Sequence, residues 1–214
     1  MRKGFGILCL LLGVTCLLGA IGLVFYNRWE AENAQVISQD LLADVQTLIE
    51  QPPTQPSLPD DPESLPDVTL PVLPELETVP EEMATVRVDG YDCIGILSIP
   101  VLELKLPVLA DWSYSKLQKA PCHYYGTYYE TDFVIAAHNY NSHFGRLSQL
   151  QPGDLILFTD VSGKDHFYEV VLTETLPPQA TQEMICSGFG LSLYTCTPGG
   201  GSRVTVRCNP LTIQ

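Results

Sequence analysis

The chain has 214 residues and a formal net charge of -14 at pH 7. Only 11 Lys and Arg are spread along it, which argues against nucleic-acid binding, because a phosphate backbone requires a concentrated basic face. This length accommodates one domain of about 120 residues together with extensions.

The N-terminus is predicted to be a membrane anchor. No charged residue lies between Lys3 and Arg28, and the apolar core at residues 5–26 has the roughly 20 residues that cross a membrane. The two basic residues before this core favour a cytoplasmic N-terminus and an exported remainder. Residues 1–28 therefore form the predicted anchor, and a secretory signal cleaved near Gly19 is the alternative.

Two extensions separate the anchor from the main domain. Residues 29–50 carry apolar side chains at helical spacing and predict a helical stalk or surface helix. Nine of the 17 prolines then fall between Pro52 and Pro80, among many carboxylates. Residues 51–85 are therefore predicted to be an extended, acidic, proline-rich linker.

The remainder, residues 86–214, predicts an all-β domain. Short apolar runs alternate with turn residues, and convincing helical patterns are confined to two short segments at residues 113–119 and 148–151. A closed barrel of eight strands follows, although this strand count also suits a sandwich. The predicted strands are Val86–Val88, Ile94–Ile99, Leu104–Leu109, Phe133–Ala137, Leu155–Phe158, Phe167–Leu172, Leu191–Thr195 and Val204–Cys208.

Two of these strands point to a reactive site. Cys196 ends one strand and Arg203 begins the next, with a six-residue loop of Thr, Pro, three Gly and Ser between them. This pattern predicts a hairpin with a thiol and a guanidinium facing each other. His138 follows the apolar run Phe133–Ala137, and a base can meet a nucleophile in space at any sequence separation.

The segment Ser192-Leu193-Tyr194-Thr195-Cys196 resembles the T-L-x-T-C pattern of the sortases, with Ser in place of the first Thr. Sortases are cysteine transpeptidases of Gram-positive cell surfaces. The resemblance covers about residues 91–209, with His138, Cys196 and Arg203 in the family's order. It implies a closed eight-stranded β-barrel, preceded here by the transmembrane helix, and it favours class B or class D.

The resemblance also implies a reaction. Cys196 would attack a peptide bond in a sorting motif similar to Leu-Pro-x-Thr-Gly and form a thioacyl intermediate. His138 would protonate the departing amine and deprotonate the incoming one, Arg203 would bind the carbonyl or oxyanion, and Thr195 would orient substrate or thiol. The expected partners are a sorting-signal peptide and an amine of a peptidoglycan precursor or pilin. No cofactor or metal is expected, and the catalytic domain would be extracellular on a single-pass membrane protein.

Several alternatives stay open at this stage. Arg207 could take the catalytic role in place of Arg203. The two arginines lie on one face of a strand about 13 Å apart, so only one can reach the sulfur, and Arg207 is otherwise a structural, solvent-facing residue. A metal site on His138 and His143 lacks a third ligand nearby, and the remaining cysteines lack zinc-binding spacing and have an undetermined disulfide state. The sequence also suits a membrane-anchored cysteine protease or a non-catalytic tethered β-domain that binds ligands. The cysteines outside the anchor and the motif are Cys93, Cys122, Cys186 and Cys208.

Overall fold

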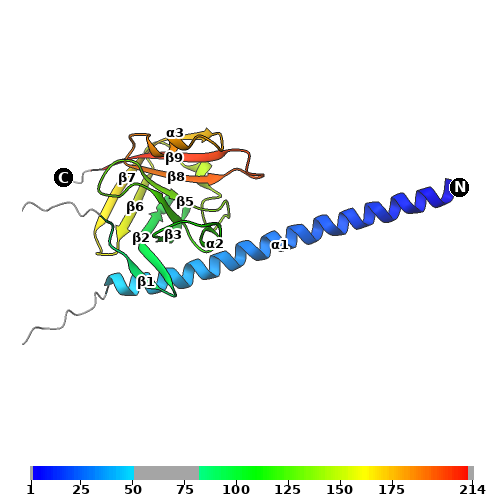
Figure 1. The fold of residues 1–214 in the computed structure, drawn as a ribbon, viewed down its shortest axis with the longest axis horizontal. Helices are drawn as coiled ribbons and strands as arrows, with labels where there is room; N and C mark the ends of the chain where they lie inside the picture. The colour runs from blue at the N-terminus through cyan, green and yellow to red at the C-terminus, as the bar shows by residue number, and fades with distance from the viewer. Residues whose placement is uncertain (1, 51–81, 212–214) are drawn as a thin grey trace, which may run out of the picture.

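The computed structural model describes residues 2–50 and 82–211 (Figure 1). Nearly all of the predicted proline-rich linker therefore lies outside the described residues. The helices are α1 (Arg2–Glu50), η1 (Pro100–Leu102), α2 (Tyr114–Leu117), η2 (Leu147–Gln149) and α3 (Thr181–Ile185). The strands are β1 (Val86–Val88), β2 (Tyr91–Ile99), β3 (Leu104–Leu109), β4 (Cys122–Tyr125), β5 (Phe133–Ala136), β6 (Leu155–Asp160), β7 (Asp165–Leu176), β8 (Leu191–Cys196) and β9 (Arg203–Pro210).

The strands form a closed barrel, which confirms the predicted fold class and excludes the sandwich. Its order is β2-β3-β4-β5-β8-β9-β7-β6, and β6 pairs with β2 to complete the ring. The pairs β3–β4 and β5–β8 are parallel, whereas the other neighbouring pairs are antiparallel. The eight barrel strands include β4, which the sequence did not predict, while β1 adds to β2 outside the ring.

Barrel closure depends on a glycine in β2. Gly95 pairs with Val108 of β3 and with Asp160 of β6, so two strands approach its backbone from either side. A Cβ atom at this position would lie 2.2 Å from the carbonyl oxygen of Thr159. Only glycine therefore allows β2 to bond to both neighbours where the sheet closes.

The barrel interior is filled by aliphatic and aromatic side chains. Phe133, Phe144 and Phe158 have no exposed surface, and Phe133 and Phe158 meet edge to face with ring centroids 5.2 Å apart. All four residues of β5 are buried: Phe133 and Ile135 belong to the main core, and α3 contacts the strand. The strand that leads to His138 is thus among the best-packed parts of the molecule.

Helix α1 is continuous through both of the segments that the sequence separated into an anchor and a stalk (Figure 1). Leu41 and Val45 are fully buried in a cluster with Ile96 and Leu109, which lies on the flank of the barrel away from the main core. Ala34 and Ser38 are also buried, so residues 29–50 pack on the barrel along most of their length and do not stand free of it. This α1 cluster also contains Val88, Cys93, Ala120 and Cys122.

The first half of α1 extends away from the barrel. Its apolar side chains from Leu10 to Tyr26 are exposed, and by length and composition the helix could cross a membrane. The absence of proline between Arg2 and Glu50 lets the apolar segment continue into the barrel-bound segment without a break.

The cysteines of the barrel are free thiols. Cys93 and Cys122 share the α1 cluster, but each pairs with Leu109 from opposite sides. Two strand spacings put their Cα atoms about 10 Å apart, which is too far for a disulfide. Burial raises the pKa of Cys93 to about 11 and that of Cys122 to about 12, so both are unreactive packing residues at neutral pH.

Candidate active site

Parallel pairing of β5 and β8 explains how two residues far apart in sequence reach one site. Ala136 lies opposite Tyr194, and His138 and Cys196 each follow two residues later, at the same end of the two strands. The Ala137 N–H donates to the Tyr194 carbonyl at 3.2 Å, which continues the pairing beyond the last residue of β5. The register therefore carries the imidazole and the thiol to one edge of the barrel.

Antiparallel pairing of β8 and β9 adds the guanidinium. Cys196 lies directly opposite Arg203, so the predicted hairpin is present. The loop between them is closed by two backbone hydrogen bonds, from Thr197 to Ser202 at 3.0 Å and from Gly200 to Thr197 at 2.8 Å. Gly200 has a φ of 74°, a left-handed conformation that favours glycine in this tight turn.

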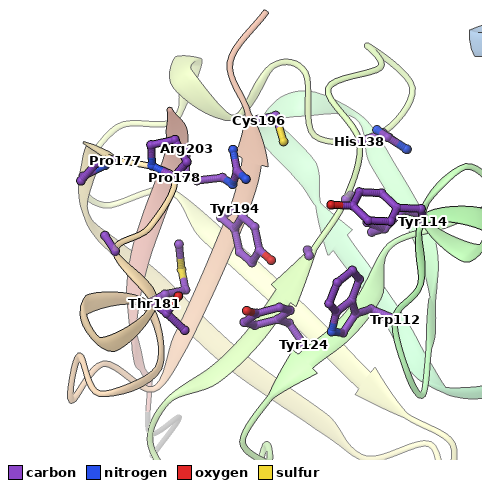
Figure 2. Close-up of a pocket in the computed structure, with 15 residues that line it drawn as sticks. Trp112, Tyr114, Tyr124, His138, Pro177, Pro178, Thr181, Tyr194, Cys196 and Arg203 are labelled. Carbon is purple, nitrogen blue, oxygen red and sulfur yellow. The ribbon is translucent and has the colours of Figure 1, made fainter. Parts of the chain in front are cut away.

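His138, Cys196 and Arg203 line one pocket (Figure 2). In this view the Cys196 sulfur lies between Arg203 on one side and His138 on the other. Each of the three residues is half-buried, so they are shielded on the barrel side and open to a ligand. The other lining residues are Trp112, Tyr114, Leu117, Tyr124, Ala136, Ala137, Pro177, Pro178, Ala180, Thr181, Met184 and Tyr194.

The two arginines of β9 have different environments. Arg203 bonds through Nη1 to the carbonyl oxygens of Gly200 and Ser202 at 3.4 and 3.3 Å, and its other N–H groups have no partner among the described residues. Those donors are available to a ligand in the pocket.

Arg207, in contrast, is 2% exposed and occupied by protein groups, so the predicted solvent-facing position is wrong. Its guanidinium donates to the Glu174 carboxylate at 2.8 Å and to the Ser192 hydroxyl at 2.8 Å. It also donates to the carbonyl oxygens of Glu183 and Met184, at 2.6 and 3.3 Å. These bonds tie α3 to the barrel wall, which is a structural role.

Thr195 faces away from the pocket. Residues alternate across a strand, so Tyr194 and Cys196 line the pocket while Thr195 is buried behind it. Its hydroxyl donates to the Ala137 carbonyl at 2.8 Å. This position differs from the predicted contact with substrate, because Thr195 connects the strand that carries Cys196 to the segment that carries His138.

One wall of the pocket is aromatic. The ring centroids of Trp112 and Tyr114 lie 5.8 Å apart, those of Trp112 and Tyr124 5.6 Å, and those of Tyr124 and Tyr194 5.4 Å. These four side chains form a continuous row from the barrel to the loop before α2. The row offers an apolar surface with hydroxyl and indole donors at its edge.

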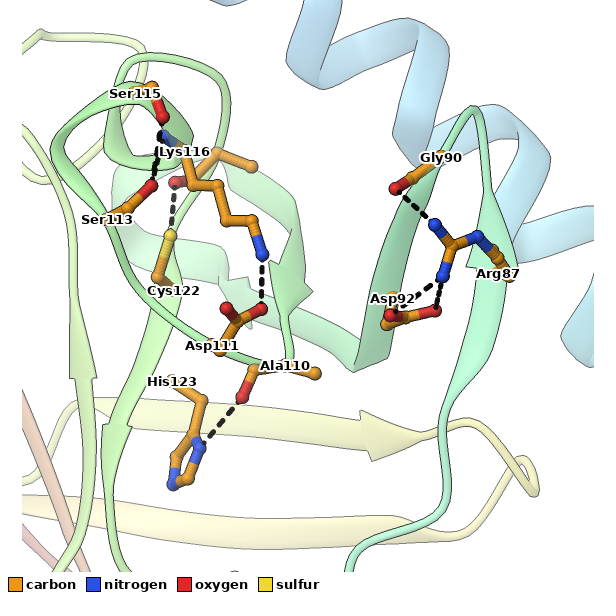
Figure 3. A network of polar contacts seen from close by, with 11 residues as sticks. Arg87, Gly90, Asp92, Ala110, Asp111, Ser113, Ser115, Lys116, Cys122 and His123 are labelled. Carbon is orange, nitrogen blue, oxygen red and sulfur yellow. Dashed lines mark hydrogen bonds and ion pairs between the residues drawn. The ribbon is translucent and has the colours of Figure 1, made fainter.

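The loop that carries Trp112 and Tyr114 is held by polar contacts at both ends (Figure 3). The Ser113 hydroxyl caps α2 by accepting a hydrogen bond from the Lys116 N–H at 3.2 Å, and the Lys116 ammonium pairs with Asp111. His123 Nδ1 contacts the Ala110 carbonyl at 3.1 Å. The aromatic wall is therefore fixed to β3 and β4.

Burial dominates the electrostatics of the two histidines near the site. It lowers the pKa of His138, whereas the Glu30 carboxylate of α1 acts in the opposite direction. His143 has no exposed surface, and burial lowers its pKa to about 4. Neither ring nitrogen of His143 has a hydrogen-bond partner within residues 2–50 and 82–211, so this histidine is a neutral packing residue. Those residues contain no group of three or more His, Cys, Asp or Glu that could hold a metal ion.

The sequence reasoning missed most of the pocket wall. The sequence assigned no role to Trp112 or Tyr124, and Tyr194 entered only as the variable position of the motif. The density of tyrosines at residues 114–129 was the available signal, but their convergence with Tyr194 depends on long-range pairing. The contact of α1 with this region, through Glu30 and Tyr140, left no local pattern in the sequence.

The sortase domain family matches residues 97–211, which is more than half of the chain. Solved structures with the same fold include Streptococcus agalactiae sortase C1, at 24% identity and TM-score 0.53 over 60% of this chain and 72% of that chain. A Clostridium perfringens sortase D5 transpeptidase matches at 22% identity and TM-score 0.52, over 62% of this chain and 84% of that one.

Corynebacterium diphtheriae sortase A matches at 23% identity and TM-score 0.52, over 58% of this chain and 63% of that chain. A search among curated proteins gives no significant match. The structural matches share the barrel, and the family match covers the segment that carries the histidine, the cysteine and both arginines of β9. This chain belongs to the sortase family, the cysteine transpeptidases.

Proposed function

We propose that Cys196, His138 and Arg203 form the catalytic centre of a transpeptidase that acts on a sorting motif similar to Leu-Pro-x-Thr-Gly. The observation that carries the proposal is the convergence of these three side chains, from the ends of β5, β8 and β9, on one pocket. A nucleophile, a proton carrier and a planar hydrogen-bond donor are the groups that acyl transfer requires.

The reaction follows from the chemistry of each group. The Cys196 thiolate attacks the carbonyl carbon of the scissile bond, and Arg203 donates hydrogen bonds to the oxygen that becomes negative. His138 gives a proton to the amine as the C–N bond breaks, which leaves a thioacyl-enzyme. An incoming amine then transfers a proton to His138, attacks the thioester and releases Cys196 as the thiolate.

The pocket supports a substrate with an apolar segment ahead of the reacting bond. Pro177 and Pro178 lie across the pocket from Trp112 and Tyr114 (Figure 2), and Met184 adds to the apolar lining. A Leu-Pro segment would bury its side chains there at low conformational cost, because proline is already restricted. The amine acceptor in this proposal is a peptidoglycan precursor or a pilin.

The apolar half of α1 supports a single-pass membrane protein with an extracellular catalytic domain. In this arrangement residues 1–28 are the anchor, residues 29–50 the helical extension, residues 51–85 the linker and residues 86–214 the catalytic domain. We also propose a class B or class D subclass. Its support is that, in the described part of the chain, the pocket-lining residues all follow β3 and none precedes the barrel.

The test compares Cys196→Ala with Cys186→Ala, because Cys186 is an exposed thiol outside the pocket. Incubation with a sorting-motif peptide should give a thioacyl adduct on the wild type and on Cys186→Ala, detected by intact mass spectrometry. Cys196→Ala should give no adduct and no product. An adduct that persists in Cys196→Ala would refute the proposed nucleophile.

A second arm identifies the acceptor chemistry. Addition of an amine should convert the thioacyl-enzyme to an amide product faster than water converts it to an acid. Product formation by water alone at an unchanged rate would favour the cysteine protease. A tethered binding domain would give peptide binding without any product.

A further inference from the structure

Helix α1 reaches the edge of the active-site region. Glu30 is half-buried, and its Oε1 accepts a hydrogen bond from the Gln118 side chain at 3.1 Å, directly after α2. A small cavity there is lined by Glu30, Trp29, Gln118 and Lys119, among others. Since Leu117 lines the catalytic pocket, this contact lies one residue from the pocket wall.

Tyr140 connects Glu30 to His138. The Glu30 carboxylate lies near the Tyr140 hydroxyl, and burial together with this carboxylate raises the pKa of Tyr140 to about 12. The Tyr140 and His138 rings lie with centroids 5.1 Å apart and planes inclined by 32°. The Tyr140 ring therefore packs against the imidazole and lies near the Glu30 carboxylate.

The segment that holds these rings is tightly bonded. The Tyr140 carbonyl accepts hydrogen bonds from the N–H groups of His143 and Gly145, both at 2.9 Å. The Phe144 N–H donates to the His138 carbonyl at 3.1 Å. A Cβ atom on Gly145 would lie 2.5 Å from the Asn139 carbonyl oxygen, so this turn requires glycine and has little freedom to shift.

We propose that Glu30 of the anchor helix is a positioning residue for His138, acting through Tyr140 and by its negative charge. The anchor helix would then complete the catalytic site as well as attach it to the membrane. Glu30 holds the phenol against the imidazole and favours the protonated ring that donates to the leaving amine. The inference rests on the proposed catalytic role of His138.

The other ionisable groups around His138 do not supply this charge. His143 packs on Tyr140 with ring centroids 5.5 Å apart, and burial keeps it neutral above about pH 4. Cys196 and Arg203 lie across the pocket from His138, and Lys119, which carries a positive charge, lines the small cavity together with Glu30. Burial lowers the pKa of His138, and Glu30 opposes that effect from α1.

The test uses the full chain in detergent, with Glu30→Gln and the matched control Glu32→Gln, which changes an exposed carboxylate two residues along the same helix. Histidine NMR titration in a Cys196→Ala background reports the protonation of His138 without any catalysis. In Glu30→Gln the His138 midpoint should move to lower pH, and Glu30→Asp should partly restore it. Glu32→Gln should leave it unchanged.

Kinetics provide the second readout. The limb of the pH profile that depends on protonated His138 should move to lower pH in Glu30→Gln, with kcat at pH 7 lower by about three- to tenfold and KM little changed, as expected for loss of one neighbouring charge. Tyr140→Phe keeps the ring but removes the hydroxyl, and should reproduce part of this loss.

These experiments test the positioning role of Glu30 and the catalytic role of His138 separately. An unchanged His138 midpoint in Glu30→Gln would overturn the role of Glu30, whatever the activity. Full activity in His138→Asn would refute the proposed catalytic role of His138, while the titration would still decide whether Glu30 controls its charge.

Discussion

Two flanks of the barrel are covered to different extents. On the pocket flank, strand ends and two loops leave a space lined by Cys196, His138 and Arg203. On the other flank, Leu41 and Val45 of α1 fill the surface completely. A substitution on the pocket flank should therefore change the reaction and leave the fold intact, whereas one beneath α1 should change stability and leave the catalytic groups in place.

Among substitutions that keep the Cys196 thiol, the largest expected effect on the pocket flank comes from Arg203→Lys. Lysine keeps the charge but loses the planar fork of donors, so kcat should fall by about 10² to 10³, the range for loss of an oxyanion donor. Steady-state kinetics and thermal unfolding on the same sample check that activity falls while Tm is unchanged.

Arg207→Lys is the matched comparison. Its guanidinium has four protein partners in a buried site, and a lysine ammonium cannot satisfy them in the same geometry. Here Tm should fall. A variant with normal Tm and a large loss of kcat would assign the catalytic role to Arg207.

On the α1 flank, Leu41→Ala should lower the free energy of unfolding by about 3 kcal/mol, within the range for buried Leu→Ala substitutions. Leu41 is 1% exposed, whereas Val36 on the same helix is 55% exposed. Urea unfolding of the full chain should therefore show little change for Val36→Ala. Equal effects of the two substitutions would mean that α1 does not stabilise the barrel.

His143 is buried against Tyr140 and should make stability depend on pH. Its folded-state pKa is about 4 and its ordinary value is 6.5, so the unfolded chain binds the extra proton more readily. The contribution is complete above pH 6.5 and is lost as the pH falls through 4, up to about 3 kcal/mol. His143→Phe should flatten this dependence, as measured by urea unfolding from pH 7 to pH 4; an unaltered slope would contradict it.

The smallest expected effect is that of Thr195→Val. The substitution removes the hydrogen bond to Ala137 and leaves a buried carbonyl unpaired, at a cost of about 1 kcal/mol in the free energy of unfolding. Activity should change by less than in Arg203→Lys, because the hydroxyl does not face the pocket. A loss of kcat as large as that of Arg203→Lys would restore a direct role for Thr195.

The sequence predicted the barrel where local pattern decides structure. The apolar run of β5 and the hairpin around Cys196 and Arg203 both have strong local signals, and both are present. Strand β4 was missed because its Cys-His-Tyr-Tyr sequence has no apolar alternation and gains its strand form from pairing with β5. Local pattern therefore identified the strands that have an apolar sequence signal of their own. It did not identify β4, whose strand conformation depends on pairing with β5.

The site could be predicted only in part for the same reason. A cysteine and an arginine across a hairpin are visible in sequence, whereas the parallel pairing that brings His138 beside Cys196 is not. The buried position of Arg207 depends on α3, which packs against β9 from a distant segment. The helical spacing of apolar residues predicted that residues 29–50 form a stalk or surface helix, and packing decides that they lie on the barrel.

Because α1 is one continuous helix, it would fix the distance between the active-site pocket and the membrane surface. Glu30 lies four positions after Tyr26, a rise of about 6 Å along a helix. If residues 5–26 span the membrane as proposed, the pocket lies close to the lipid headgroups. A partner that carries its own membrane anchor would then lie at the same distance from the membrane as the pocket. Enzyme and partner would meet by diffusion in the membrane plane, and this confinement raises the effective concentration of both substrates.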